Sequence, residues 1–474
     1  MDGHELAAWV RDARARTLAL VADLTDEQLI GPRLPIVNPL LWEIGHVAWF
    51  QERWVLRHAA GRPPLRADGD MLYDSSAVPH DARWDLPLPS REETLAYLHE
   101  VRDRVLACLT EWPPDAPQLY FVRLSVFHED MHDEAVTYTR QTLGYPPPRT
   151  AWADPLAGSG NAAPVAGGGR HGGGRQGNER EGGEREGGGR QRGAAGRGPE
   201  PGGPLPGDVE VPGGTFLLGA LPGQEPFVFD NEKWAHPVEV RPFAIGRAPV
   251  TQAEFAAFVE AGGYGRREYW SEAGWRWREA AGAEHPVYWR RAPGGGWLRR
   301  DFDTWVALEP HRPVIHVNWY EAEAYCRWAG RRLPTELEWE VAASAEPGGS
   351  GRLSPRKRRF PWGDEPPTPE RANLDGRAMG CVDVGALPAG DSAFGCRQML
   401  GNVWEWTASD FLPYPGFEPD PYKDYSQPWF RTHKVLRGGC WVTRARLLRN
   451  TWRNFYTPDR RDVWAGFRTC AVDR

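Results

Sequence analysis

Residues 127–135 read FHEDMHDEA and place two histidines, His128 and His132, four positions apart. In a helix, side chains at i and i+4 leave the same face one turn apart. Two imidazoles held in this way can bind one metal ion. Glu134 follows them as a third ligand or as an acceptor that orients an imidazole N–H. The alternative interpretation is two surface histidines on a charged helix, but a third histidine, His46, lies inside another apolar helix and favours the metal site.

Four predicted helices in residues 1–150 are typical of a helical bundle. A capping residue and a proline, Asn38-Pro39, open the second helix. Ser90 and Glu93 form a capping box that opens the third, and Gly144 ends the fourth. Such a bundle can direct all three histidines inward at one level. The four helices are predicted over residues 4–23, 39–57, 91–111 and 117–143.

The composition changes abruptly after the bundle. Residues 151–207 are rich in Gly, Arg and Glu and hold almost nothing to bury, which predicts a disordered linker. RNA binding by its arginines is the alternative, but the interspersed glutamates and the lack of aromatic residues favour a solvated spacer. Residues 208–474 combine short predicted strands with stretches rich in Gly, Pro, Trp and Arg, which predicts an irregular α+β domain. Capping boxes at Thr251, Asn318 and Thr335 each predict a short helix there.

Charge and composition exclude several classes of function. The net charge of −7 gives no electrostatic case for binding nucleic acid or anionic lipid. No apolar run approaches the roughly 20 residues that span a bilayer, and the N-terminal segment lacks the apolar core of a signal peptide. Six cysteines without CxxC pairs fit reduced thiols, and we expect a cytoplasmic protein. The 24 tryptophans indicate a fold held by aromatic packing.

Both halves of the chain resemble known families. Residues 1–150 resemble the DinB-like four-helix bundles, whose HxxxHxE signature is met by His128, His132 and Glu134. Residues 208–474 resemble the formylglycine-generating-enzyme (sulfatase-modifying factor) fold, which is C-type-lectin-like. Together they resemble the iron-dependent sulfoxide synthases of ergothioneine and ovothiol biosynthesis and the selenoneine synthases. The motifs that carry the second resemblance are PVTQAEFAAFVEAGGY (249–264), RRLPTELEWEVAA (331–343), FPWGDE (360–365), GNVWEWTASDF (401–411), VLRGGCW (435–441) and GFR (466–468).

The resemblance implies a non-haem Fe(II) held by His46, His128 and His132, with open positions for O2 and a substrate. The implied reaction is the O2-dependent formation of a C–S or C–Se bond at imidazole C2 of hercynine (trimethylhistidine). A site of two histidines and one carboxylate, in which Glu134 replaces a histidine, is the alternative. Glu43, one turn before His46, is interpreted as a solvated helix residue, although it too could orient an imidazole.

The stretch WRNFYTPDRR (452–461) is similar to a family segment that contacts the substrates. The resemblance implies that Asn454 contacts the imidazole-bearing substrate and that Arg460 binds a carboxylate of the thiol donor. A surface position beside Arg461 is the alternative for Arg460. Met131, where the family often has glutamine, is expected near the imidazole substrate. Arg83 stands roughly where a family arginine meets the donor carboxylate.

A tyrosine is expected to donate a proton or an electron near the metal centre, and the candidates are Tyr414, Tyr422, Tyr425 and Tyr456. Tyr456 also stands where related synthases carry an acidic residue that engages the donor's ammonium group. This departure, Met131 and the loop LYDSSAVPHDARWDLPLPS (72–90) argue against γ-glutamylcysteine as donor. Cysteine or a selenium donor such as a selenosugar remains open. The stretches NPLLWEIGHVAWFQE (38–52) and LYDSSAVPHD (72–81) resemble the selenoneine branch.

Other functions fit parts of this pattern. A formylglycine-generating oxidase needs two cysteines where this chain has Thr443 and Leu448, and only Cys440 lies nearby. A DinB-type metal-dependent thiol transferase would need neither the second domain nor O2, and an ovothiol-type synthase would act on histidine. A metal-stabilised adaptor would keep its binding after the loss of one histidine, whereas the oxygenase would lose turnover. The sequence leaves open whether the protein is a monomer or a dimer.

Overall fold

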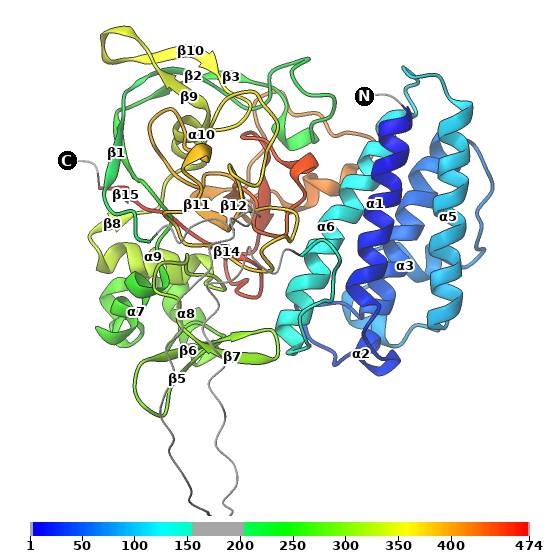
Figure 1. The fold of residues 1–474 in the computed structure, drawn as a ribbon, viewed down its shortest axis with the longest axis horizontal. Helices are drawn as coiled ribbons and strands as arrows, with labels where there is room; N and C mark the ends of the chain where they lie inside the picture. The colour runs from blue at the N-terminus through cyan, green and yellow to red at the C-terminus, as the bar shows by residue number, and fades with distance from the viewer. Residues whose placement is uncertain (1–2, 154–202, 473–474) are drawn as a thin grey trace, which may run out of the picture.

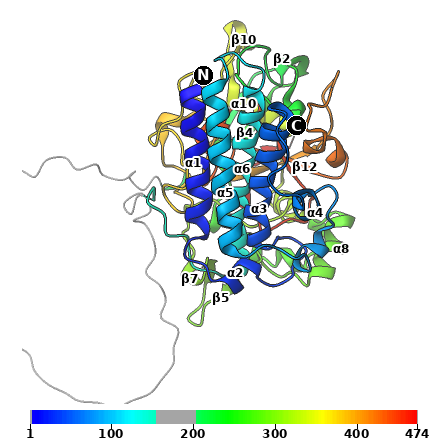
Figure 2. The ribbon, with the colours of Figure 1, turned by 90° about the vertical axis from the view of Figure 1, so that its right-hand side faces the viewer.

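The computed structural model describes residues 3–153 and 203–472, so most of the predicted linker lies outside the described residues. The chain forms an N-terminal helical bundle and a C-terminal α+β domain, which lie side by side (Figure 1). Turning the molecule places the bundle helices in front of the second domain, with their axes nearly parallel (Figure 2). The fold class expected from the sequence is confirmed.

Four long helices build the bundle: α1 (Gly3–Val21), α3 (Leu40–Gln51), α5 (Arg91–Glu111) and α6 (Leu119–Leu143). The capping box at Ser90 is present, and Gly144 ends α6 in the left-handed conformation, because a helix end of this type disfavours a Cβ. Two short helices that the sequence did not predict, α2 (Asp26–Ile30) and α4 (Gly69–Tyr73), lie in the connections.

The start of α3 differs from the prediction. The helix begins at Leu40, Pro39 occupies the capping position, and no side chain caps the helix end. Asn38 does not cap the helix because its side-chain oxygen accepts a 2.6 Å hydrogen bond from Arg83, while its amide nitrogen donates one to Glu43. Near its other end the helix widens into a π-helical segment, Glu52–Ala59. Such widening is frequent at functional sites, and the sequence did not predict it.

The second domain is built from short strands and short helices. The capping boxes at Thr251, Asn318 and Thr335 open α7 (Gln252–Glu260), α9 (Trp319–Trp328) and α10 (Glu336–Ser344) as predicted. Its two four-stranded sheets are formed by β1 (Asp208–Val211), β4 (Phe243–Gly246), β8 (Arg331–Arg332), β11 (Trp404–Asp410), β12 (Lys434–Arg437), β13 (Asn454–Tyr456), β14 (Ala465–Gly466) and β15 (Cys470–Ala471). Their strand orders are β1-β4-β15-β8 and β13-β12-β11-β14, and β11 pairs with β14 in parallel.

The remaining elements lie around these sheets. α8 (Glu272–Ala281) packs on α9. The peripheral strands are β2 (Gly214–Leu218), β3 (His236–Val240), β5 (Trp289–Arg291), β6 (Trp297–Asp301), β7 (Thr304–Ala307), β9 (Ala345–Pro347) and β10 (Leu353–Lys357).

The apolar core runs without a break from the bundle into the second domain. Phe127 of α6 packs against Phe227 and Phe229, with ring centroids 5.1 and 6.3 Å away. Large aromatic side chains and arginines paired with acids fill the interior, which fits the aromatic packing expected from the tryptophan content. The largest side chains with less than 2% exposure include Trp42, Trp339, Trp404, Trp406, Trp441, Arg14, Arg140, Arg437, Arg453 and Arg468.

Helix α6 fixes the bundle to the second domain. Arg446 forms a bidentate ion pair with Asp130 of α6, with bonds of 2.6 and 2.7 Å. Trp464 donates to Thr137, and the Gln141 side chain donates to the carbonyl of Arg300. The same helix carries two of the three predicted metal ligands, so the ligands are anchored from both domains.

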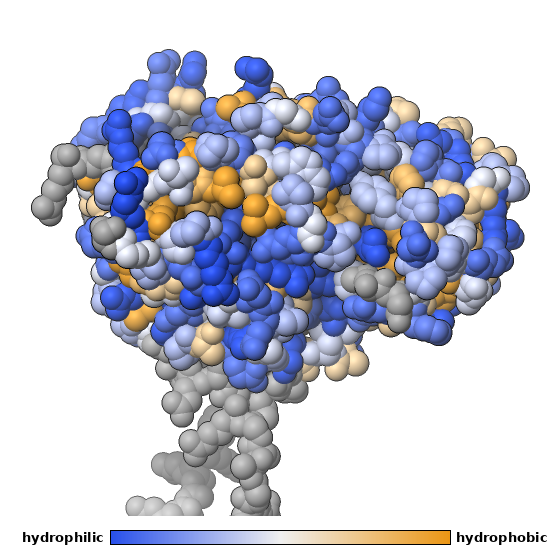
Figure 3. Space-filling view, turned by 90° about the horizontal axis from the view of Figure 1, so that it is seen from above, coloured by the Kyte–Doolittle hydropathy of each residue, from blue (hydrophilic) through white to orange (hydrophobic). Residues whose placement is uncertain are grey.

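The surface is largely hydrophilic on the face shown in Figure 3, with apolar residues gathered in small groups. Among the described helices, none is both long and apolar enough to cross a membrane. All six cysteines are buried and unpaired.

Candidate metal centre

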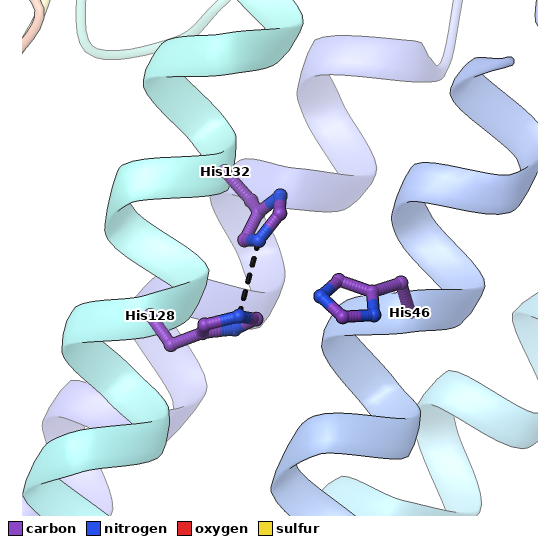
Figure 4. A group of neighbouring side chains, drawn as sticks. All are labelled: His46, His128 and His132. Carbon is purple, nitrogen blue, oxygen red and sulfur yellow. Dashed lines mark hydrogen bonds between the residues drawn. The ribbon is translucent and has the colours of Figure 1, made fainter. Parts of the chain in front are cut away.

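The three predicted histidines meet inside the bundle. His46 projects from α3, and His128 and His132 project from α6 toward it (Figure 4). One ligand atom from each lies within 4.8 Å of the other two. The Nε2 atoms of His128 and His132 are 3.1 Å apart. Two nitrogens bound side by side to one ion at roughly 2.1 Å lie about 3 Å apart, so this spacing fits a shared metal.

Hydrogen bonds at the other ring nitrogens set the orientation of two imidazoles. His46 Nδ1 lies 2.8 Å from the backbone carbonyl of Tyr73, and His132 Nδ1 lies 2.5 Å from Glu43 Oε1. Both acceptors require a proton on Nδ1, which leaves Nε2 free to bind a metal. His128 Nδ1 is buried without a partner, and its ring is stacked 3.6 Å from Phe50 instead.

The carboxylate that orients a metal-binding histidine is Glu43. The expectation that Glu134 would orient one is wrong. Glu134 is buried at the junction of the domains, where it accepts hydrogen bonds from Trp404 and Thr443. Glu43 is only 4% exposed, so it is not the solvated residue that the sequence suggested. Its position one turn before His46 was the sequence feature that indicated a role at the metal site. Its hydrogen-bond partner is His132, on the other helix.

The electrostatics of the site favour neutral imidazoles at His46 and His128. Burial lowers the pKa of His46 to about 3 and the pKa of His128 well below its ordinary value. Burial alone would raise the pKa of the Glu43 carboxyl, but His132, His46 and Asn38 together lower it to about 2. Neutral imidazole is the form that binds metals, and a carboxylate behind one of the rings strengthens its donation. The donor set therefore fits a divalent transition metal such as Fe(II).

Aromatic rings pack against the histidines, a role that no sequence pattern indicated. The Trp42 ring is stacked on His46 at 4.8 Å with an interplanar angle of 9°. Trp49 lies 5.7 Å from the same imidazole. Together with Phe50 on His128, these rings exclude water from one side of the centre.

Two predicted carboxylate-binding arginines are already engaged. Arg83 is 9% exposed and donates a 2.6 Å hydrogen bond to Asn38, with its guanidinium over Trp42 at 4.0 Å. Arg460 forms a bidentate pair with Asp462 through bonds of 2.6 and 2.7 Å. Asp462 therefore occupies the fork of Arg460 that a substrate carboxylate would need. Arg83 is held against the bundle through Nη1 and Trp42, while its buried Nε has no hydrogen-bond partner among the described residues.

The other predicted substrate residues lie on two elements, Met131 on α6 and Asn454 and Tyr456 on β13. Met131 is half-buried on α6 beside His132, and its sulfur lies 3.9 Å from the Tyr425 hydroxyl. Asn454 and Tyr456 occupy alternate positions of β13, so both side chains leave the same face of that strand. The Tyr456 ring lies 5.1 Å from the Arg460 guanidinium.

The candidate tyrosines differ in their distance from the histidines. The ring of Tyr422 lies 6.4 Å from the ring of His128 and 4.9 Å from that of Phe50. The ring of Tyr425 lies 6.4 Å from the ring of Tyr422. Tyr414 donates its hydroxyl to Glu336 and packs against His236, contacts that lie within the second domain.

A further tyrosine, Tyr138, escaped the sequence analysis. It is half-buried on α6, ten residues after His128, and its ring lies 5.8 Å from the Arg460 guanidinium. Residues 128, 131, 135 and 138 follow helical spacing, so Tyr138 shares the α6 face of His128 and Met131. That spacing is the signal that could have identified it.

Comparison with known proteins places this arrangement in a family. Residues 10–136 match the DinB superfamily, and residues 195–473 match the sulfatase-modifying factor enzyme 1-like domain. The hercynine oxygenase of Mycolicibacterium thermoresistibile is 41% identical over 99% of this chain and 95% of its own length. The chain belongs to the hercynine oxygenase family. Its members are oxidoreductases, and the corresponding protein of Mycobacterium tuberculosis is 39% identical over 98% of each chain.

The second domain alone is similar to another group. The formylglycine-generating enzyme of Streptomyces coelicolor is 35% identical over 56% of this chain and 88% of its own length. The two positions that would need cysteines for that activity are Thr443 and Leu448. Thr443 instead donates a 2.8 Å hydrogen bond to Glu134, so this hydroxyl joins the two domains.

Proposed function

We propose that the protein is a non-haem Fe(II)- and O2-dependent synthase that joins sulfur or selenium to the imidazole C2 of hercynine. The observation that carries this proposal is the convergence of three imidazoles in a bundle docked on the second domain. Family membership and the names of the relatives support hercynine as the substrate. His46, His128 and His132 would hold the metal, whose chemistry when bound is the reduction of O2.

The reaction balances with O2 as the only oxidant. Hercynine loses its C2–H, a thiol loses its S–H, and O2 yields one sulfoxide oxygen and one water as the C–S bond forms. With a selenol as donor and a selenoether as product, hydrogen peroxide replaces water and the sulfoxide oxygen. The protein itself has to orient the imidazole, exclude bulk water and supply protons.

Residues on both domains would share these tasks. Tyr422 is favoured as the proton donor because its ring lies nearest to His128 among the four candidates, and Tyr456 is the alternative. Asn454 on β13 and Met131 on α6 would contact hercynine. Trp42 and Phe50 would keep water from the rear of the histidines.

The donor side favours a small or weakly charged molecule. Asp462 neutralises Arg460, and the phenol rings of Tyr138 and Tyr456 flank the same guanidinium. A donor with two carboxylates, such as γ-glutamylcysteine, would have to compete with Asp462. These contacts support cysteine or a selenosugar as donor. The unpaired cysteines fit a cytoplasmic location for such a reaction.

A competition assay tests the proposal. The Fe(II)-loaded protein would be mixed with hercynine, cysteine, γ-glutamylcysteine and a selenosugar under argon, then exposed to O2, with products identified by mass. We expect a cysteine or selenosugar adduct of hercynine that forms only after O2 is admitted. Thiol transfer under argon would instead identify a DinB-type transferase. In a parallel reaction with histidine in place of hercynine, formation of a histidine adduct would identify an ovothiol-type synthase.

A further inference from the structure

Arg83 stands at the end of a chain of hydrogen bonds that reaches the candidate metal centre. Arg83 Nη1 donates to Asn38 Oδ1 at 2.6 Å, and Asn38 Nδ2 donates to Glu43 Oε2 at 2.6 Å. The other oxygen of Glu43 accepts from His132 Nδ1 at 2.5 Å. Each polar group in this chain therefore has its orientation fixed by the next one.

The same arginine supports a second histidine through an aromatic ring. Its guanidinium lies 4.0 Å from the centre of the Trp42 ring. The Trp42 ring is also stacked on the imidazole of His46. The indole N–H of Trp42 donates to the carbonyl of Leu72 at 2.7 Å, which holds the ring in place. Arg83 thus reaches His132 through polar groups and His46 through a ring.

The geometry points to Arg83 as a positioning residue of the metal centre, acting through Asn38–Glu43 on His132 and through Trp42 on His46, rather than as a ligand of the donor carboxylate. This inference rests on the proposed metal centre. The buried carboxylate of Glu43 needs a compensating positive charge. Arg83 supplies this charge through Asn38, which lies between the two side chains. The Arg83 side chain is only 9% exposed, so little of it faces a substrate.

The hydrogen bonds that link Arg83 to His132 also account for two features that the sequence did not predict. Asn38 leaves the start of α3 uncapped because its amide joins Arg83 to Glu43. The loop between α4 and α5 carries Arg83 in a short 3-10 helix, His80–Trp84, which brings the guanidinium beneath α3. Both features place the arginine in contact with the bundle rather than with the second domain.

Metal binding by the full-length apoprotein tests this role without relying on turnover. Co(II) would be titrated into the protein and its visible absorption bands recorded for the natural protein, Arg83→Met, Glu43→Gln and the double variant. We expect each single variant to bind Co(II) about 10–100-fold more weakly with shifted bands. The double variant should be no weaker than Glu43→Gln alone, because both residues act through one chain. Arg83→Lys should recover part of the affinity, since its ammonium can donate to Asn38.

Arg291 provides the matched control. It also pairs with a carboxylate, Glu260, and lies over a tryptophan, Trp297, but it is exposed on the second domain, away from the Arg83–Asn38–Glu43 chain. Arg291→Met should leave the affinity and the bands unchanged. Unchanged Co(II) affinity and bands in Arg83→Met would overturn the inference, whether the variant then shows a raised donor KM or only a lower melting temperature. Failure of the natural protein to bind Co(II) would instead reject the proposed metal centre.

Discussion

Glu134 of the bundle accepts a 2.6 Å hydrogen bond from the indole nitrogen of Trp404 in the second domain, 270 residues further along the chain. Its second oxygen accepts from Thr443 at 2.8 Å. Glu134 lies two residues after His132, so the helix that carries the histidines is held from the side opposite to the site. Domain docking and ligand geometry therefore depend on the same turn of α6.

Replacing Glu134 should loosen this junction. Glu134→Ala leaves the buried donors of Trp404 and Thr443 without an acceptor, which costs roughly 1–3 kcal/mol for each orphaned group. Chemical denaturation followed by tryptophan fluorescence should show this loss in the free energy of unfolding. Glu100→Ala on the exposed face of α5 is the control and should change stability little. Equal unfolding curves for Glu134→Ala and the natural protein would contradict the role of this contact.

Gly45 allows α3 to approach Tyr73, whose carbonyl holds His46. A methyl group at Gly45 would overlap the buried ring of Tyr73, so Gly45→Ala has to displace it. We expect a loss of about 1–3 kcal/mol in the free energy of unfolding and weaker metal binding. Gly265→Ala, where an added methyl meets nothing within 4 Å, is the control. Undiminished metal affinity in Gly45→Ala would argue that the Tyr73 carbonyl does not orient His46.

Tyr422 should act in the chemical step and not in metal binding. Tyr422→Phe removes the hydroxyl but keeps the ring that packs on Phe50, so the centre should keep its shape. We expect kcat to fall about 100-fold or more, as for the loss of a positioned proton donor, with metal affinity unchanged. Tyr414→Phe should keep full activity because its hydroxyl bonds to Glu336. The reverse pattern, or a loss confined to Tyr456→Phe, would reassign the proton donor.

Asp230 should make stability depend on pH. Burial raises the pKa of its carboxyl from 3.8 to about 6. The stabilisation from the protonated acid is complete below the unfolded pKa of 3.8 and is lost as the pH rises through 6. Asp230→Asn, which cannot ionise, should therefore be roughly 1–3 kcal/mol more stable than the natural protein at pH 7.5 and gain nothing at pH 4. Exposed Asp303→Asn is the control; an equal effect of Asp230→Asn at both pH values would contradict the shift.

Features set by neighbours in the sequence were predicted well. The capping boxes at Ser90, Thr251, Asn318 and Thr335 each depend on residues three positions apart, and all four are present. The meeting of His46 with the α6 histidines followed from helix spacing and the bundle. The HxxxHxE pattern led to Glu134, but spacing alone could not show that this carboxylate turns toward Trp404.

The predictions of side-chain roles were wrong where a side chain bonds to a residue on another element. Asn38 had the sequence of a helix cap, yet its amide oxygen accepts from Arg83 and its amide nitrogen donates to Glu43. The sequence around Glu43 was typical of a solvated residue, but His132 from another helix bonds to its carboxylate. Such bonds depend on tertiary contacts, which local patterns do not contain.

The most direct test of the proposed function is the mass of hercynine after aerobic incubation with the Fe(II)-loaded protein and cysteine or a selenosugar. His128→Ala, which removes one of the three imidazoles, would be incubated in parallel. We expect the natural protein to convert hercynine to an adduct that carries sulfur or selenium at C2, and His128→Ala to leave it unchanged. Unconsumed hercynine in the presence of bound iron, O2 and both donors would contradict the proposed function.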